Sequence, residues 1–233
     1  MQFFILVLLV CLFIFLFCVY FLAKDDLILL RKDVSMEKFF NLTFLGTIFC
    51  LLSARLFYGI FHATTILLNP IVLLLFPYFP GLSLVGGVIG GAIFFLYLYF
   101  VKKKQLPLGR MFDFCSIGFL VTLPVGFLGY FMFAQENFSI IKTISLMAVY
   151  IVLFIIFYKV LLPKMINGKF KDGTISLLLL ICFSAISLIS HIIGNFKGII
   201  SLENIVLSLM LITSIAFLVW QENLLTKIKT FKK

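Results

Sequence analysis

Ionisable and polar side chains are rare within the long apolar stretches of this sequence, so each one found there is a candidate for chemistry. Arg55, Tyr58 and His62 follow one another at spacings of three and four residues, and a helix would place them along one polar stripe. A guanidinium group is suited to holding a phosphate or a carbonyl oxygen. A structural interpretation stays open beside it, in which Arg55 extends to an interface or pairs within the protein and Tyr58 is an interfacial aromatic residue.

Two further ionisable residues stand at the ends of apolar stretches. Asp113 follows Arg110 by three residues, where an acid suits the positive end of a helix and Arg110 can be its partner. Either a helix-start role or a functional role fits Asp113. His191 has no charged neighbour in its own stretch, which fits a hydrogen-bonded packing residue or an isolated site residue.

The sequence predicts no metal site and no bound cofactor. It has two histidines and a single carboxylate within the apolar stretches, which cannot supply a ligand set. The motifs G-x-S-x-G and H-E-x-x-H are missing. The five cysteines all lie in apolar runs without metal-type spacing, and we interpret them as packed or lipid-facing residues: Cys11, Cys18, Cys50, Cys115 and Cys182.

The composition indicates which elements must position these residues. Of 233 residues, 64% are hydrophobic and 12% are charged, whereas a soluble domain is about half apolar and a quarter charged. Apolar runs of about twenty residues are long enough to cross a bilayer as helices. We therefore predict an all-α integral membrane protein, a single domain of seven transmembrane helices, near residues 3–23, 40–61, 82–101, 111–134, 140–162, 173–194 and 204–221.

The segment 63–80, between the second and third helices, does not fit a full span. Pro70, Pro77 and Pro80 each remove a backbone donor, so we predict a half-inserted or interfacial arm.

Basic residues predict the orientation. Sixteen of them flank one set of helix ends, and the opposite connections hold only Lys142 and Lys197. By the positive-inside rule the N-terminus is outside and the C-terminus is cytoplasmic. The net charge of +10 is then a consequence of topology, and no nucleic-acid partner is expected.

Glycines recur at helix-packing spacing in two of the apolar runs. The run from Gly81 to Phe95 has two overlapping G-x-x-x-G pairs, and Gly126 and Gly129 lie three apart in a later run. Small residues at such spacings let helix backbones approach closely.

Several blocks together resemble the prolipoprotein diacylglyceryl transferase family in order and spacing. "ARLFYGIF" is similar to the G-x-R-x-x-Y block, and "PGLSLVGGVIGG" is similar to the G-M-S-F-H-G-G-x-x-G block. "GRMFDF" resembles the start of the next helix, and "GFLGYFMFAQ" stands where the family has G-R-x-G-N-F-x-N-G-E. "DGTISLLLL" and "SHIIGN" resemble the penultimate helix. The resemblance implies transfer of diacylglyceryl from phosphatidylglycerol to the lipobox cysteine of a prolipoprotein.

The departures from the family pattern fall on its polar positions. The resemblance aligns the family's histidine with Val85 and its penultimate-helix arginine and glutamate with about Ser187 and His191. The signature arginine, two asparagines and glutamate align with Phe127, Tyr130, Phe133 and Gln135. The glycines remain while the polar groups are replaced, so no catalytic residue is assigned.

Three functional hypotheses follow. The first is a degenerate family member in a bacterial inner membrane that still holds a phospholipid such as phosphatidylglycerol, or a lipoprotein signal-peptide helix. The second is an active divergent transferase that uses Arg55, His62 and Gln135, and the third is a small lipid or solute transporter. For lipid binding we expect contacts at Arg55, Tyr58, His62, Gly86, Gly87, Gly126, Gly129 and Gln135.

Overall fold

The computed structural model describes residues 2–32, 34–62, 81–102, 106–133, 140–194 and 201–222. They form α1 (Gln2–Ala23), α2 (Leu27–Arg31), α3 (Met36–Phe61), α5 (Leu84–Lys102), α6 (Leu108–Phe133), α7 (Ile140–Ile156), η2 (Phe157–Leu161), α8 (Leu162–Ile166), α9 (Thr174–Gly194) and α10 (Leu202–Gln221). Within these ranges there is no strand, and seven helical stretches are long and apolar enough to cross a membrane. The predicted all-α fold with seven membrane-type helices is confirmed. The predicted arm at 63–80 lies outside the described residues.

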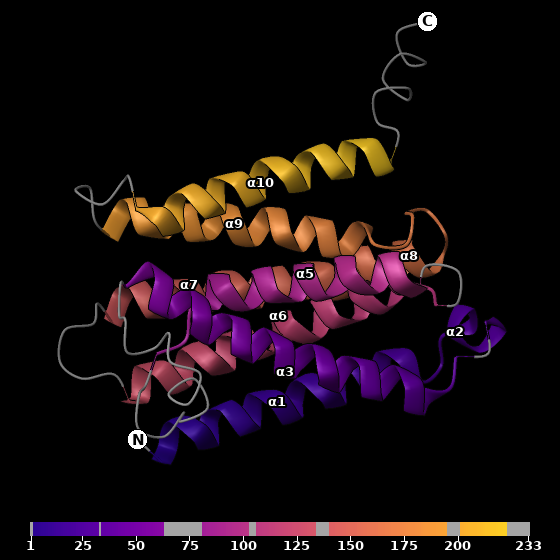
Figure 1. Ribbon diagram of the computed structural model, residues 1–233, viewed down its shortest axis with the longest axis horizontal. Coiled ribbons are helices and arrows are strands. Elements are labelled where there is room, and N and C mark those ends of the chain that lie inside the picture. Colours follow the sequence, from indigo (N-terminus) through magenta and orange to yellow (C-terminus); the bar gives the residue numbers. More distant parts are fainter. Residues whose placement is uncertain are drawn as a thin grey trace, which may run out of the picture.

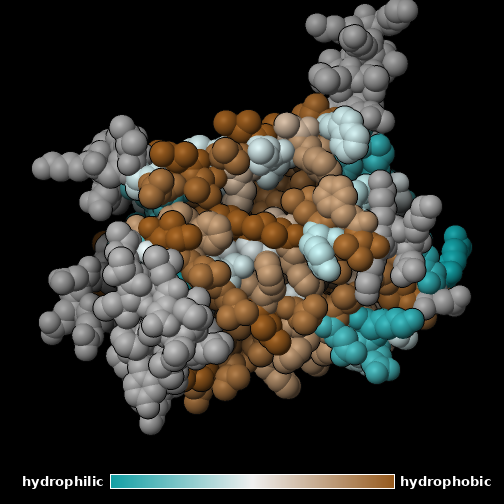
Figure 2. Space-filling view, in the orientation of Figure 1, coloured by the Kyte–Doolittle hydropathy of each residue, from teal (hydrophilic) through white to brown (hydrophobic). Residues whose placement is uncertain are grey.

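The long helices lie roughly side by side in a bundle (Figure 1). α2 and α8 are at one end of the bundle, and the first residues of α1 are at the other (Figure 1). α6 contacts α1, α7 and α9, α3 pairs most closely with α5, and α10 packs mainly against α9. The space-filling surface of the long helices is largely hydrophobic, as a bundle surrounded by lipid requires (Figure 2).

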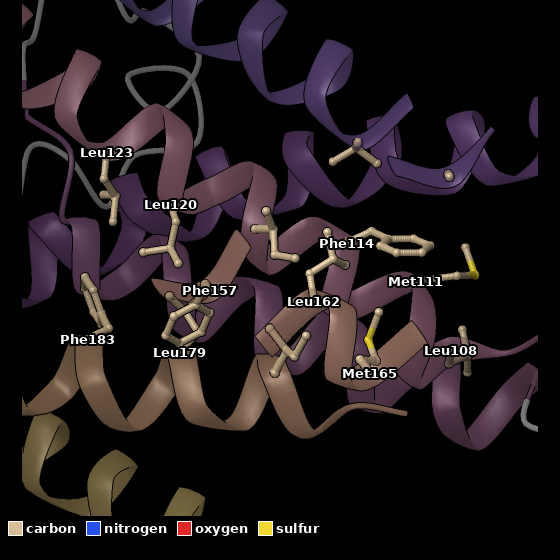
Figure 3. Close-up of a cluster of buried hydrophobic side chains, with 14 of the residues drawn as sticks. Leu108, Met111, Phe114, Leu120, Leu123, Phe157, Leu162, Met165, Leu179 and Phe183 are labelled. Carbon is tan, nitrogen blue, oxygen red and sulfur yellow. The ribbon is translucent and has the colours of Figure 1, made fainter. Parts of the chain in front are cut away.

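The apolar core is built on α6. Figure 3 shows side chains of α6 facing those of η2, α8 and α9, and the labelled residues are Leu108, Met111, Phe114, Leu120, Leu123, Phe157, Leu162, Met165, Leu179 and Phe183. Phe114, Ile117 and Leu120 of α6 are fully buried. α6 is therefore the element against which the others are positioned.

Glycines set the closest helix approaches. A Cβ on Gly86 of α5 would lie 2.4 Å from the Cβ of Phe57 in α3, and one on Gly90 would lie 2.4 Å from the Cβ of Ser53. A Cβ on Gly129 of α6 would lie 2.3 Å from Cγ1 of Val7 in α1. The glycine spacing seen in the sequence thus belongs to two helix pairs, α3 with α5 and α1 with α6.

The fifth membrane-type helix changes its hydrogen-bond pattern midway. α7 continues through the five-residue π-helix η2 into α8, which begins next to Pro163. Proline has no N–H to donate to the carbonyl four residues earlier, and a π-type turn is one way to accommodate this loss without ending the helix.

Candidate functional site

Arg55 lies in α3, six residues before the helix ends at Phe61, and its side chain is 1% exposed. The backbone next to it is tied to the following segment, because the N–H of Ser83 donates to the carbonyl of Ala54 at 2.9 Å. A guanidinium buried to this extent is stable only where partners replace its water. Arg55 is thus part of the protein interior, and its side chain does not extend to the surface of the bundle.

Tyr58 and His62 form the outer part of the predicted stripe. Their rings stack with centroids 4.2 Å apart, and His62 Nδ1 lies 3.2 Å from the carbonyl oxygen of Tyr58. Gly81 has a φ of +151°, and a Cβ there would lie 2.3 Å from the ring of Tyr58. Both its conformation and this close contact require glycine. His62 is exposed, so the stripe runs from a buried cation to an exposed imidazole.

The block from Gly81 to Gly91 is used for capping and packing. The hydroxyl of Ser83 accepts the N–H of Gly86 at 3.1 Å, and its carbonyl accepts the N–H of Gly87 at 3.0 Å, which caps the start of α5. Val85 is 3% exposed and belongs to the core. A Cβ on Gly87 would make ordinary contacts with the Cβ of Ala54, at 3.5 Å, and the carbonyl oxygen of Cys50, at 3.7 Å.

An aromatic stack joins α6 and α7. The rings of Phe127 and Tyr150 are nearly parallel, with centroids 5.7 Å apart and planes at 15°. Tyr150 is 2% exposed, and Ser187 of α9 lies near its hydroxyl. Gly126 and Gly129 flank Phe127 and face α1, toward Cys11 and Val7 respectively. The sequence did not single out Tyr150, since nothing in its own apolar run distinguishes it from other aromatic residues.

Three of the predicted site residues cannot be placed as side chains. Gln135 lies outside the described residues, and of Tyr130 and Phe133 only the helical backbone is described. Their proposed roles therefore stay predictions.

His191 has a polar partner on the neighbouring helix. Its Nδ1 lies 2.9 Å from Oδ1 of Asn204 in α10. Since the amide oxygen can only accept, Nδ1 carries the proton, and in the neutral ring Nε2 is then an acceptor. His191 is therefore held in one tautomer and orientation by Asn204.

A buried polar network occupies the other end of the bundle. Arg110 at the start of α6 binds Asp26 through Nε at 3.0 Å and Nη2 at 2.9 Å. Its Nη1 lies 3.3 Å from Oδ1 of Asp172 and 3.3 Å from the carbonyl oxygen of Met165. The side chains of Arg110 and Asp26 are 4% and 5% exposed. This arginine joins three segments that are far apart in the sequence.

Asp113 accepts hydrogen bonds from another helix. Its two oxygens accept the backbone N–H groups of Gly173, at 2.7 Å, and Ser176, at 2.8 Å. The expected pairing of Asp113 with Arg110 is replaced by these two bonds, because the first turn of α9 needs acceptors and Arg110 is engaged by Asp26 and Asp172. Asp113 acts as a capping residue for α9.

Three carboxylates at the same end of the bundle were not predicted as site residues from the sequence. Asp26 and Asp172 bind Arg110, and Glu222 accepts the hydroxyl of Thr174 at 2.7 Å and the N–H of Lys171 at 3.0 Å. Each lies just outside an apolar run, where a charged residue is ordinarily solvated. The available signal was the Asp-Gly-Thr triplet before α9, which is typical of a helix start.

Comparison with known proteins identifies the family of this chain. A family model described as prolipoprotein diacylglyceryl transferase matches residues 1–220. The chain belongs to this family. No curated protein and no solved structure gives a significant match. Family membership confirms the resemblance drawn from the motif blocks, and the family implies membrane association and lipid and prolipoprotein substrates.

The structure describes two residues that the motif resemblance predicts to replace polar residues of the family, Phe127 and Val85. Phe127, which the motif resemblance predicts to stand at the signature arginine, stacks on Tyr150. Val85, aligned with the histidine, is buried in the core. A hydrocarbon ring at Phe127 supplies neither charge nor a hydrogen-bond donor, so these positions contribute packing where the family pattern has polar groups.

Proposed function

We propose that this member of the prolipoprotein diacylglyceryl transferase family binds an anionic phospholipid, or the signal-peptide helix of a prolipoprotein, without transferring diacylglyceryl between them. The observation that carries the proposal is the stacking of Phe127 on Tyr150 at 5.7 Å, at the position aligned with the signature arginine. The surrounding glycines and the helix pairs remain, which supports retention of the scaffold.

The family reaction requires groups that a phenylalanine side chain, such as that of Phe127, does not have. The thiol sulfur attacks the glycerol carbon that bears the phosphate, and the carbon–oxygen bond breaks to release glycerol phosphate. The departing phosphate gains negative charge and is stabilised by a cation, while a thiol of pKa about 8.5 needs a base. Phe127 provides neither group.

Arg55 supports the lipid-binding half of the proposal. Its guanidinium lies in the apolar interior at 1% exposure, beside the close α3–α5 contact. A planar guanidinium binds a phosphate group through two parallel hydrogen bonds. The partner we propose is phosphatidylglycerol or a lipid of like headgroup, in a bacterial inner membrane.

The test is a lipidation assay with the purified full chain, a lipobox peptide and phosphatidylglycerol. We expect phosphatidylglycerol to co-purify with the protein and the peptide mass to stay unchanged. Robust turnover to the diacylglyceryl peptide would overturn the loss of activity, whereas absence of bound phospholipid would overturn the binding.

A second candidate, an active divergent transferase, is favoured by one observation. Asn204 fixes His191 through Nδ1 at 2.9 Å, which leaves Nε2 as a base. If the lipidation assay shows turnover, His191→Gln should abolish it, and Asn204→Ala should lower kcat while altering its pH profile. A His62→Gln variant tests the other candidate base, whose Nδ1 lies 3.2 Å from the carbonyl oxygen of Tyr58, and loss of turnover in that variant alone would assign the role to His62.

A further inference from the structure

The short helix α2 presents leucines outward at one end of the bundle. It follows α1 after a turn in which the N–H of Asp26 donates to the carbonyl of Ala23. Leu27 and Leu30 are 77% and 58% exposed, whereas Leu29 is 2% exposed and belongs to the core. Since residues three apart share a helix face, the two exposed leucines lie together.

The position of α2 is fixed by the buried ion pair. Oδ1 of Asp26 accepts the N–H groups of Ile28, at 3.0 Å, and Leu29, at 3.1 Å, and so caps the helix. Oδ2 of the same carboxylate binds Arg110. The outward leucines are therefore held against α6 in a defined place, and their exposure is a feature of the folded protein.

Cations surround these leucines. Lys24, Arg31 and Lys32 are all exposed. Of the two aspartates next to them in the sequence, Asp25 lies 3.8 Å from Lys24, and Asp33 is outside the described residues. Hydrophilic surface gathers at the end of the molecule that carries α2, while the sides of the bundle are hydrophobic (Figures 1 and 2). The first membrane-type stretch ends at Ala23, so α2 lies at the level where acyl chains give way to headgroups.

Apolar side chains next to exposed cations, at the end of a membrane-spanning bundle, match the chemistry of an anionic bilayer surface. We infer that α2 is an interfacial anchor, in which Leu27 and Leu30 enter the acyl–headgroup boundary and Arg31 and Lys32 bind the phosphates of anionic lipids. This contact is separate from Arg55 and lies at the opposite end of α3 from it. It therefore goes beyond the proposed function.

Fluorescence in lipid nanodiscs tests the insertion. The sequence has one tryptophan, so Leu30→Trp in a Trp220→Phe background reports on α2 alone. We expect its emission to be quenched by phospholipid brominated on the acyl chain and to be protected from aqueous iodide. Lys169→Trp in the same background is the matched control, since Lys169 is exposed in the loop after α8, at the same end. It should respond to iodide instead.

The cation contribution is tested with the Arg31→Gln/Lys32→Gln double variant. A basic residue near an anionic surface changes binding by roughly fivefold, so retention of phosphatidylglycerol over a zwitterionic lipid should fall by about 30-fold for two.

If the tryptophan at position 30 responds to iodide as the control does, or is protected only when a soluble protein is added, the inference is overturned. Both outcomes are independent of Arg55, so this inference and the proposed function fail separately.

Discussion

The carboxylate of Asp113 stabilises a helix other than its own. It is the sixth residue of α6, and both of its oxygens accept N–H groups at the start of α9. The first N–H groups of a helix have no partner within that helix, and in a membrane protein water is not freely available to replace one. One side chain therefore joins two elements that are about sixty residues apart in the sequence.

The Asp113→Asn variant should lower the stability of the folded protein. An amide has one acceptor oxygen, so one of the two N–H groups would face another donor, at a cost of about 1–3 kcal/mol. Thermal unfolding in detergent should show a lower Tm. Asp25→Asn is the control, since the side chain of Asp25 is 83% exposed and should tolerate the change. Equal Tm values for the two variants would contradict this role.

Arg55→Gln should weaken the preference for anionic lipid while the protein stays folded. Glutamine keeps hydrogen-bond donors but removes the charge, and loss of a charge-assisted contact costs roughly 1.5–3 kcal/mol, or about ten- to a hundredfold in affinity. Native mass spectrometry of phosphatidylglycerol retention against a zwitterionic lipid measures the effect. Unchanged preference in a folded variant would assign Arg55 a structural role alone.

At the scale of elements, the close pair α3–α5 depends on which glycine faces the partner helix. Gly86 and Gly87 are neighbours in sequence but differ by about 100° around the helix. A Cβ on Gly86 would meet Phe57 at 2.4 Å and the carbonyl oxygen of Ser53 at 3.1 Å, close to the α3 backbone. A Cβ on Gly87 would make an ordinary contact.

Gly86→Ala should therefore destabilise the protein by about 1–3 kcal/mol, because α3 and α5 must move apart. Gly87→Ala should be neutral or slightly stabilising, since alanine favours the helix and its Cβ would lie 3.5 Å from that of Ala54. Comparison of the two Tm values is the measurement. Similar losses for both variants would show that helix propensity or lipid contacts, and not close approach, control this pair.

At the scale of the whole molecule, the distribution of basic residues predicts one orientation. From the sixteen cations that flank one set of helix ends, we expect α2, α8 and the C-terminus to lie in the cytoplasm and the N-terminus outside. A C-terminal fluorescent reporter should be active in cells, and an N-terminal tag should be reached by an impermeant label. The reverse pattern of labelling would contradict the positive-inside assignment.

The seven-helix fold could be predicted because hydrophobic length is a local property of each run. The hydrogen-bond partners of the charged groups could not be predicted. Arg110 binds Asp26 across 84 positions, and it was expected to bind Asp113, three positions away. Glycine spacing predicted close approach, but Gly126 and Gly129 gave no sign that α1 is the helix they face. Likewise Phe127 was seen as a lost cation, while its stacking on Tyr150 depends on the packed bundle.

The pairing of α9 with α10 has a consequence for biogenesis. α10 packs mainly against α9, and its end is bound to the start of α9. Gln221 Nε2 donates to the carbonyl of Asp172 at 2.9 Å, and Glu222 accepts the hydroxyl of Thr174. We therefore expect α9 and α10 to assemble as a hairpin, which docks on α6 when Asp113 accepts the first turn of α9. A nascent chain arrested before Glu222 would lack the acceptor for Thr174, and membrane proteases would meet the unfinished hairpin before the finished protein.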